Sequence, residues 1–155
     1  MAQGRFEMNQ RIEPFIGIGS YKLMSSMQEL KSILNDQGVN YKEEIWPNDE
    51  CTNPVPWNII RTGTGLNFFF AKDKLFKIYV EDVFDGCLPN GIGIGTDMEE
   101  AQRIDPELKY DDWEEDWESP EGYWLEDDLD TGKVMTITVF IREVLDDELF
   151  EQYNW

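Results

Sequence analysis

The pattern of apolar and polar positions predicts three helices. The first spans residues 25–35, where apolar residues recur at helical spacing and Gly38 lies just beyond the end. The second is shorter, over residues 97–104, because Pro106 disfavours helical geometry at the residue before it. A third is predicted over residues 146–153. The apolar stripe of the first helix comprises Met27, Leu30, Ile33 and Leu34.

Alternation of apolar and polar residues, rich in β-branched and aromatic types, predicts β-strands between these helices. Turn signals at Ala71 to Lys74 and at Asp130 to Lys133 predict two tight hairpins. The proline-rich segment from Pro47 to Pro56 is predicted to be a loop or a sheet edge. The predicted strands cover residues 57–61, 66–70, 75–80, 123–126 and 134–141.

Two stretches of the chain are near-copies of each other. FIGIGSYKLMSSMQELKSI begins at Phe15, and NGIGIGTDMEEAQRI begins at Asn90. Further on, KLFKIYV at residues 74–80 aligns with KVMTITV at residues 133–139. Each copy also has the spacing of a helix capping box, in which a hydroxyl and a carboxylate satisfy the free amides of the first turn. The two pairs are Ser26 with Glu29 and Thr96 with Glu99.

These copies predict an α+β fold with a single domain over residues 1–155. Two similar helix-plus-β-hairpin units, at about 15–82 and 90–141, would share one antiparallel sheet with the helices on one face. The glycines would then permit close packing or an unusual backbone angle. A phosphate cradle is the alternative, but G-x-G-x-x-G spacing is missing, and three acids in the second copy would repel a phosphate. They are Asp97, Glu99 and Glu100.

The net charge of −20 is concentrated in one half of the chain. Residues 1–78 hold nine acids and nine bases, whereas residues 79–155 hold 24 acids and four bases. Such a field repels nucleic acid and anionic membranes and attracts cationic partners. Solubility alone is the simpler explanation of acidic residues, but it does not account for an excess confined to one repeat.

Several kinds of chemistry lack the residues they need. Histidine is absent, which excludes histidine-activated nucleophiles and histidine metal ligands. Cys51 and Cys87 are too far apart in sequence to suggest a metal site. A calcium loop in EDDLDTGK fails because Leu129 occupies a ligand position. We therefore predict no enzyme activity, cofactor or metal. No membrane-spanning run or signal peptide is apparent, which predicts a cytoplasmic protein.

The segment from Asp105 to Asp130 is the strongest functional candidate. It holds 13 acids against one base, Lys109, and interleaves them with five tyrosines and tryptophans. Aromatic residues supply anchor area at protein interfaces, while carboxylates pair with lysine and arginine. The alternative is that the tryptophans belong to the core and the acids line its wet side. The predicted partner-binding residues are Asp111, Asp112, Trp113, Glu114, Glu115, Asp116, Trp117, Glu118, Trp124, Asp127 and Asp128.

The size, the paired GIGIG and K-[LV]-x-x-I-x-V units and the stretch YDDWEEDW resemble a bacterial immunity protein. Such proteins are the acidic antidotes of contact-dependent growth-inhibition and related polymorphic toxin systems. The resemblance implies binding to a cognate, often basic, toxin domain without chemistry. Three alternatives stay open: a nucleic-acid mimic, an inhibitor of a secreted enzyme similar to the β-lactamase-inhibitory proteins, and a carboxylate-dependent hydrolase.

Overall fold

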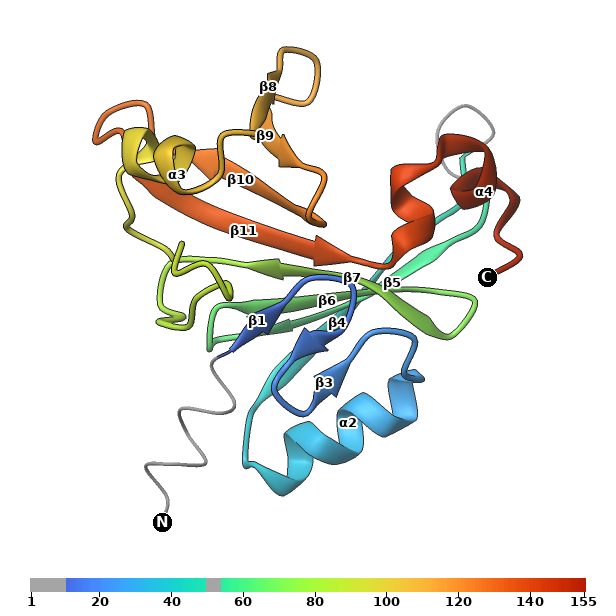
Figure 1. The fold of residues 1–155 in the computed structure, drawn as a ribbon. Coiled ribbons are helices and arrows are strands. Elements are labelled where there is room, and N and C mark those ends of the chain that lie inside the picture. Colours follow the sequence, from blue (N-terminus) through green and yellow to red (C-terminus); the bar gives the residue numbers. More distant parts are fainter. Residues whose placement is uncertain (1–10, 50–53) are drawn as a thin grey trace.

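The structure is a computed structural model that describes residues 11–49 and 54–155. Its centre is an eight-stranded antiparallel sheet that takes strands from both halves of the chain (Figure 1). Cys51 lies outside the described residues. In spatial order the strands are β4 (Tyr41–Trp46), β5 (Trp57–Thr62), β6 (Leu66–Ala71), β7 (Lys74–Val80), β11 (Val134–Phe140), β10 (Tyr123–Asp127), β9 (Asp116–Ser119) and β8 (Lys109–Asp111).

Each half of the sheet follows a helix in the chain. Helix α2 (Met27–Asp36) precedes β4 to β7, and helix α3 (Met98–Ile104) precedes β8 to β11. Strands β7 and β11 join the two halves at the middle of the sheet. The fold is therefore α+β, as the sequence predicts. The remaining elements are a small sheet of β1 (Ile12–Glu13), β2 (Gly17–Ile18) and β3 (Tyr21–Lys22), the 3-10 helix η1 (Arg142–Leu145) and helix α4 (Asp147–Gln152).

The two faces of the large sheet pack differently. On the face that we call the helix face, α2, α3 and the small sheet cover a continuous core. One cross-strand row of this core is Ile60, Phe68, Ile78, Val139 and Tyr123. On the opposite face, which we call the outer face, η1 and α4 cover only a cluster around Ile59, Phe69 and Phe76. The expectation of helices on one face therefore holds for α2 and α3 but not for α4.

Local sequence signals fare differently at the two main helices. Ser26 accepts the backbone N–H of Glu29 at 3.1 Å, and the Glu29 carboxylate accepts the N–H of Ser26. The first predicted capping box is thus confirmed. The second is wrong, since α3 starts after Asp97 with no side-chain cap. Thr96 instead accepts the N–H of Gly93 at 3.0 Å, which closes the turn before the helix.

The glycine-rich lead-ins have the structural role predicted for them. Gly17 has a φ of +143°, and a Cβ there would collide with the carbonyl oxygen of Tyr21. Gly91 and Gly95 also adopt positive φ, at +95° and +93°. Gly132, at +70°, lies in the predicted turn between β10 and β11. These angles are ones that residues with a Cβ rarely adopt.

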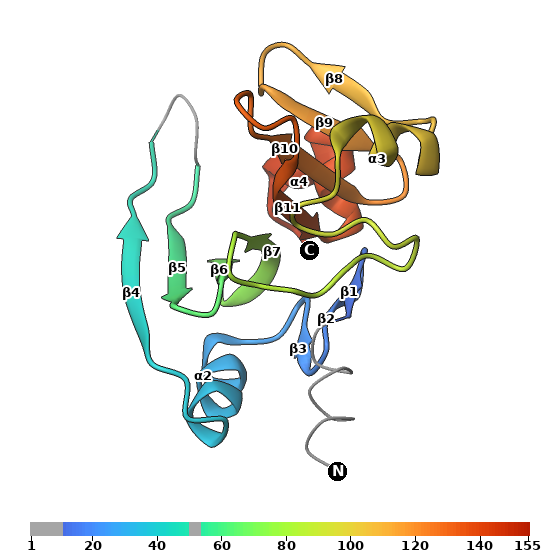
Figure 2. The same cartoon turned by 90° about the vertical axis from the view of Figure 1, so that its left-hand side faces the viewer.

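The sequence did not predict the three short strands of the small sheet, nor three strands of the large sheet, β4, β8 and β9. Strand β4 forms an edge of the sheet, and β8 and β9 form a hairpin at the opposite edge (Figure 2). All three are rich in acids or lysines, which are depleted in strands. Pairing outweighs that weak preference, because β4 and β9 lie beside the more apolar strands β5 and β10, and β8 pairs with β9. Charged residues are common on edge strands because they discourage aggregation.

Candidate partner-binding surface

The β8–β9 hairpin displays the most acidic part of the chain. Its turn is closed by Asp111, whose Oδ1 accepts the backbone N–H groups of Trp113 at 2.9 Å and Glu114 at 3.0 Å. The N–H of Glu115 donates to the carbonyl of Asp111 at 2.8 Å, and Glu115 adopts a φ of +58°. Aspartate stabilises such turns because its short side chain reaches the following amides. Asp111 therefore holds the hairpin tip in shape.

Trp113 stands at this tip and is 90% exposed. Asp112, Glu114 and Glu115 beside it are also exposed. A tryptophan normally buries most of its large apolar area, so an exposed indole on a short, hydrogen-bonded turn resembles an unoccupied interface anchor. Figure 1 shows the hairpin rising from the sheet, away from the helix-face core. The tip thus presents one apolar group within a patch of carboxylates.

Trp117 has a different position from Trp113. It lies on the helix face of β9, packs against the core and contacts the ring of Tyr110 at a centroid distance of 5.3 Å. Its Nε1 donates to Oδ1 of Asp127 at 3.3 Å. The tryptophans four residues apart are therefore not neighbours on one surface. The hydrogen bond between Trp117 and Asp127 joins the hairpin to β10.

The remaining predicted residues divide between the turn of β10–β11 and the outer face. Asp128 accepts the N–H of Asp130 at 2.8 Å and so caps that turn. Trp124 lies on the outer face with its ring 4.5 Å from that of Phe140. Asp116 and Glu118 share the outer face with Trp124, because Glu118 is its direct cross-strand partner. The structure thus gathers two groups, the hairpin tip and an outer-face acidic pair.

A row of polar and amphipathic side chains crosses the outer face, and sequence reasoning missed it. Directly opposed residues on seven strands form the row, which spans about 30 Å at about 4.8 Å per strand. From one side to the other it comprises Arg61, Asn67, Tyr79, Thr138, Trp124, Glu118 and Lys109.

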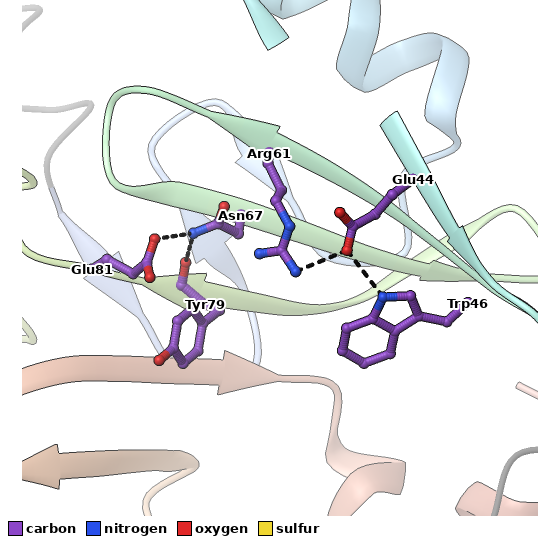
Figure 3. A network of polar contacts seen from close by, with 6 residues as sticks. All are labelled: Glu44, Trp46, Arg61, Asn67, Tyr79 and Glu81. Atoms are coloured by element: carbon purple, nitrogen blue, oxygen red, sulfur yellow. Dashed lines mark hydrogen bonds and ion pairs between the residues drawn. The ribbon is translucent and has the colours of Figure 1, made fainter. Parts of the chain in front are cut away.

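The first-half end of this row is internally paired (Figure 3). Arg61 donates to Glu44 at 2.9 Å, and Trp46 donates to the same carboxylate at 3.0 Å. Asn67 donates to Glu81 at 2.9 Å and to the carbonyl of Tyr79 at 3.3 Å. These side chains therefore already have hydrogen-bonding partners within the protein.

The middle of the outer face carries two groups with displaced pKa values. Burial and a 2.9 Å hydrogen bond to Glu126 raise the pKa of Tyr79 to about 12. Burial lowers the pKa of Lys77 to about 8, against the opposing effect of the Glu114 and Glu126 carboxylates. Its ammonium lies over the rings of Phe69 at 4.4 Å and Trp57 at 5.1 Å. Lys77 thus remains mainly a cation at neutral pH and contacts aromatic faces rather than a carboxylate.

The second-half end of the row holds an acidic pair, Asp116 and Glu118. Asp116 is only 8% exposed, and its Oδ1 has no hydrogen-bond partner among the described residues. Burial, and then the adjacent Glu118 carboxylate, raise the pKa of Asp116 to about 7. Burial also raises the pKa of Glu118. At neutral pH the pair therefore holds a proton for part of the time.

We predict that Asp116→Asn makes stability less dependent on pH. Asp116 has a higher pKa in the folded state than the ordinary value of 3.8. Its protonated carboxyl group therefore adds to the free energy of unfolding below about pH 4, and this stabilisation is lost as pH rises through about 7. After allowance for solvent screening, the unfolding free energy of the wild type should fall by about 1–2 kcal/mol more than that of the variant between pH 5 and pH 8. Urea denaturation at both pH values measures this, with the exposed Asp112→Asn as charge-matched control. Parallel curves for the wild type and Asp116→Asn would contradict it.

A cavity of about 810 Å³ lies away from the hairpin tip, between the β1–β2 turn, the end of α3 and the β9–β10 turn. Its walls include Pro14, Phe15 and Tyr123. The buried Asp105 beside it accepts hydrogen bonds from Ser119 at 2.6 Å and from Tyr123. Burial opposes ionisation of Asp105, but these hydrogen bonds hold its pKa below the ordinary value. Asp105 therefore joins α3 to β9 and β10.

Within residues 11–49 and 54–155, no three acidic or cysteine side chains are grouped as a metal site would require. In the same residues, no helix has both the length and the apolar character to cross a membrane. Comparison with protein-family models, curated proteins and solved structures gives no match for this chain. The case for a function therefore rests on the surface described above.

Proposed function

We propose that the protein binds and neutralises a basic toxin domain, as the immunity proteins of contact-dependent growth-inhibition and polymorphic toxin systems do. It acts in the cytoplasm by covering the active site or the substrate surface of the toxin, and not by catalysis. The observation that carries the proposal is Trp113, which is 90% exposed on a hydrogen-bonded turn amid carboxylates. A nuclease presents a basic surface to its substrate, which such a patch complements.

The arrangement of charge supports this proposal over simple solubility. On the first-half hairpin, Glu43 pairs with Lys31 at 2.8 Å and Glu44 pairs with Arg61 at 2.9 Å. The acids of the β8–β9 hairpin form no such ion pair within the described part of the chain. Carboxylates without a cation keep their full field for an approaching partner.

We also infer that the two helix-plus-four-strand halves are copies of one unit. The sequence copies align Ile78 with Ile137 and Val80 with Val139. In the sheet, Ile78 faces Val139 and Val80 faces Ile137, so exchanging the copies leaves the pairing unchanged. The β8–β9 hairpin then corresponds to β4–β5, and the second copy is the one specialised for binding. A crystallographic register in which Ile78 does not face Val139 would remove this inference.

The proposal predicts that the gene directly upstream encodes a large secreted protein with a basic C-terminal domain, and the test uses that domain. Size-exclusion chromatography of the purified pair should give a 1:1 complex, and co-expression should restore growth to cells that produce the toxin domain. A basic toxin domain from an unrelated system is the control, and it should be neither bound nor neutralised. Continued killing by the upstream domain without complex formation would overturn the proposal.

A further inference from the structure

We propose that Asp116 and Glu118, with Trp124 beside them, form the seat for one guanidinium group of the partner. This inference rests on the proposed function, because it supposes a cationic partner. It identifies a second contact on the outer face, separate from the indole of Trp113 at the hairpin tip. The seat would fix the orientation of the toxin, whereas the tip supplies apolar area.

The geometry of β9 brings the two carboxyl groups together. Residues two apart on a strand point to the same face, and Asp116 and Glu118 are close enough to share a hydrogen bond. The Oδ1 atom of Asp116 is buried and unpartnered among the described residues. Buried acceptors almost always have a donor. Among the described residues no donor reaches this atom, and a bound guanidinium would bring N–H donors to the carboxyl group.

The charged groups that face the pair are almost all acidic. Asp111 on β8 and Glu114 on the turn act on both carboxyl groups, and Asp147 on α4 acts on Glu118. Lys109 faces Glu118 across the strands, but no ion pair joins them in the described structure. Among the described residues, neither Asp116 nor Glu118 forms an ion pair with a lysine or arginine.

An arginine side chain suits this site better than a metal ion does. No third ligand completes a metal cluster among the described residues. A guanidinium offers a planar fork of N–H donors that binds carboxylates in pairs, and it stacks on aromatic rings. Trp124 lies directly across from Glu118 and supplies such a ring. The seat thus offers acceptors and an indole to one flat cation.

Binding at this seat releases a proton. In the free protein, the pair holds one proton for part of the time at neutral pH, because its members repel each other. A guanidinium stabilises the form in which both carboxyl groups are ionised, so the shared proton passes to the solvent. Affinity for the cation should therefore increase as pH rises through about 7.

The test uses N-acetyl-arginine amide as the probe and N-acetyl-citrulline amide as its uncharged match. Side-chain carboxyl carbons of the protein are followed by NMR across a pH titration. At saturation, the arginine probe should lower the apparent pKa values of the Asp116–Glu118 pair by about one unit, the lower end of the effect of an adjacent opposite charge. The citrulline probe should leave them unchanged.

Two variants within the seat and one outside it make the result specific. Asp116→Asn and Glu118→Gln should each abolish the response to the arginine probe, whereas Asp36→Asn, at an exposed position on α2, should keep it. Equal responses to both probes, or equal loss in Asp36→Asn, would overturn the proposal. The measurement needs no toxin. If the toxin binds but the pKa values of the pair do not respond to arginine, the seat is wrong and the proposed function stands. If the pair responds to arginine but no toxin binds, the proposed function is wrong and the seat stands as a guanidinium site.

Discussion

Replacing Trp113 with alanine is expected to speed dissociation of the toxin complex about 30-fold, which corresponds to the loss of about 2 kcal/mol at an interface hot spot. The indole is 90% exposed in the free protein, so its removal costs the fold almost nothing. Its full apolar area becomes buried only in the complex. The association rate should change little, since no charge is altered. Surface plasmon resonance with the immobilised toxin domain measures both rates.

Ile45→Ala is the matched control for this variant. Ile45 is also an exposed apolar residue, at 65%, but it lies on β4 at the opposite edge of the sheet. Its loss should leave both rates unchanged, and circular dichroism should show all three proteins folded. If Ile45→Ala weakens binding while Trp113→Ala does not, the first-half edge of the sheet is the interface.

Neutralising the three exposed acids of the hairpin tip is expected to slow association about tenfold at low salt. The changes are Asp112→Asn, Glu114→Gln and Glu115→Gln, which spare the Asp111 side chain that closes the turn. The wild-type rate should fall steeply with added salt, because the screening length shrinks from about 30 Å at 0.01 M to about 10 Å at 0.1 M. The variant should show a much flatter dependence. Stopped-flow mixing across a salt series tests both.

A triple variant with the same change in net charge separates local from global electrostatics. Asp36→Asn, Glu99→Gln and Glu148→Gln remove three exposed acids spread over α2, α3 and α4. This control should keep most of the wild-type association rate. If the two triple variants slow association equally, only net charge matters, and the hairpin tip has no special role in guiding the partner.

The sequence by itself determined the features that depend on a few neighbouring residues. The capping box at Ser26 and Glu29 needs only the spacing of its two side chains. The Gly132 turn follows from the tolerance of glycine for positive φ. The central strands β7 and β11 follow from runs of β-branched and aromatic residues. The acidic character of the second half is composition alone, and it directed attention to the segment that forms the β8–β9 hairpin.

Only the tertiary structure decided which members of that segment are exposed and which are buried. Side chains on a strand alternate between faces, so the register of β8 and β9 sets the fate of each residue. It turns Trp117 into the core, leaves Trp113 in solvent at the tip, and buries Asp116 beside Glu118. The residues that become exposed and those that become buried are equally acidic and aromatic in the sequence. Contacts with β10 selected this register, because burying the indole of Trp117 against the core stabilises it over the neighbouring registers. Strand β10 is distant from β4 to β7 in the chain but is joined to them in the sheet through β11.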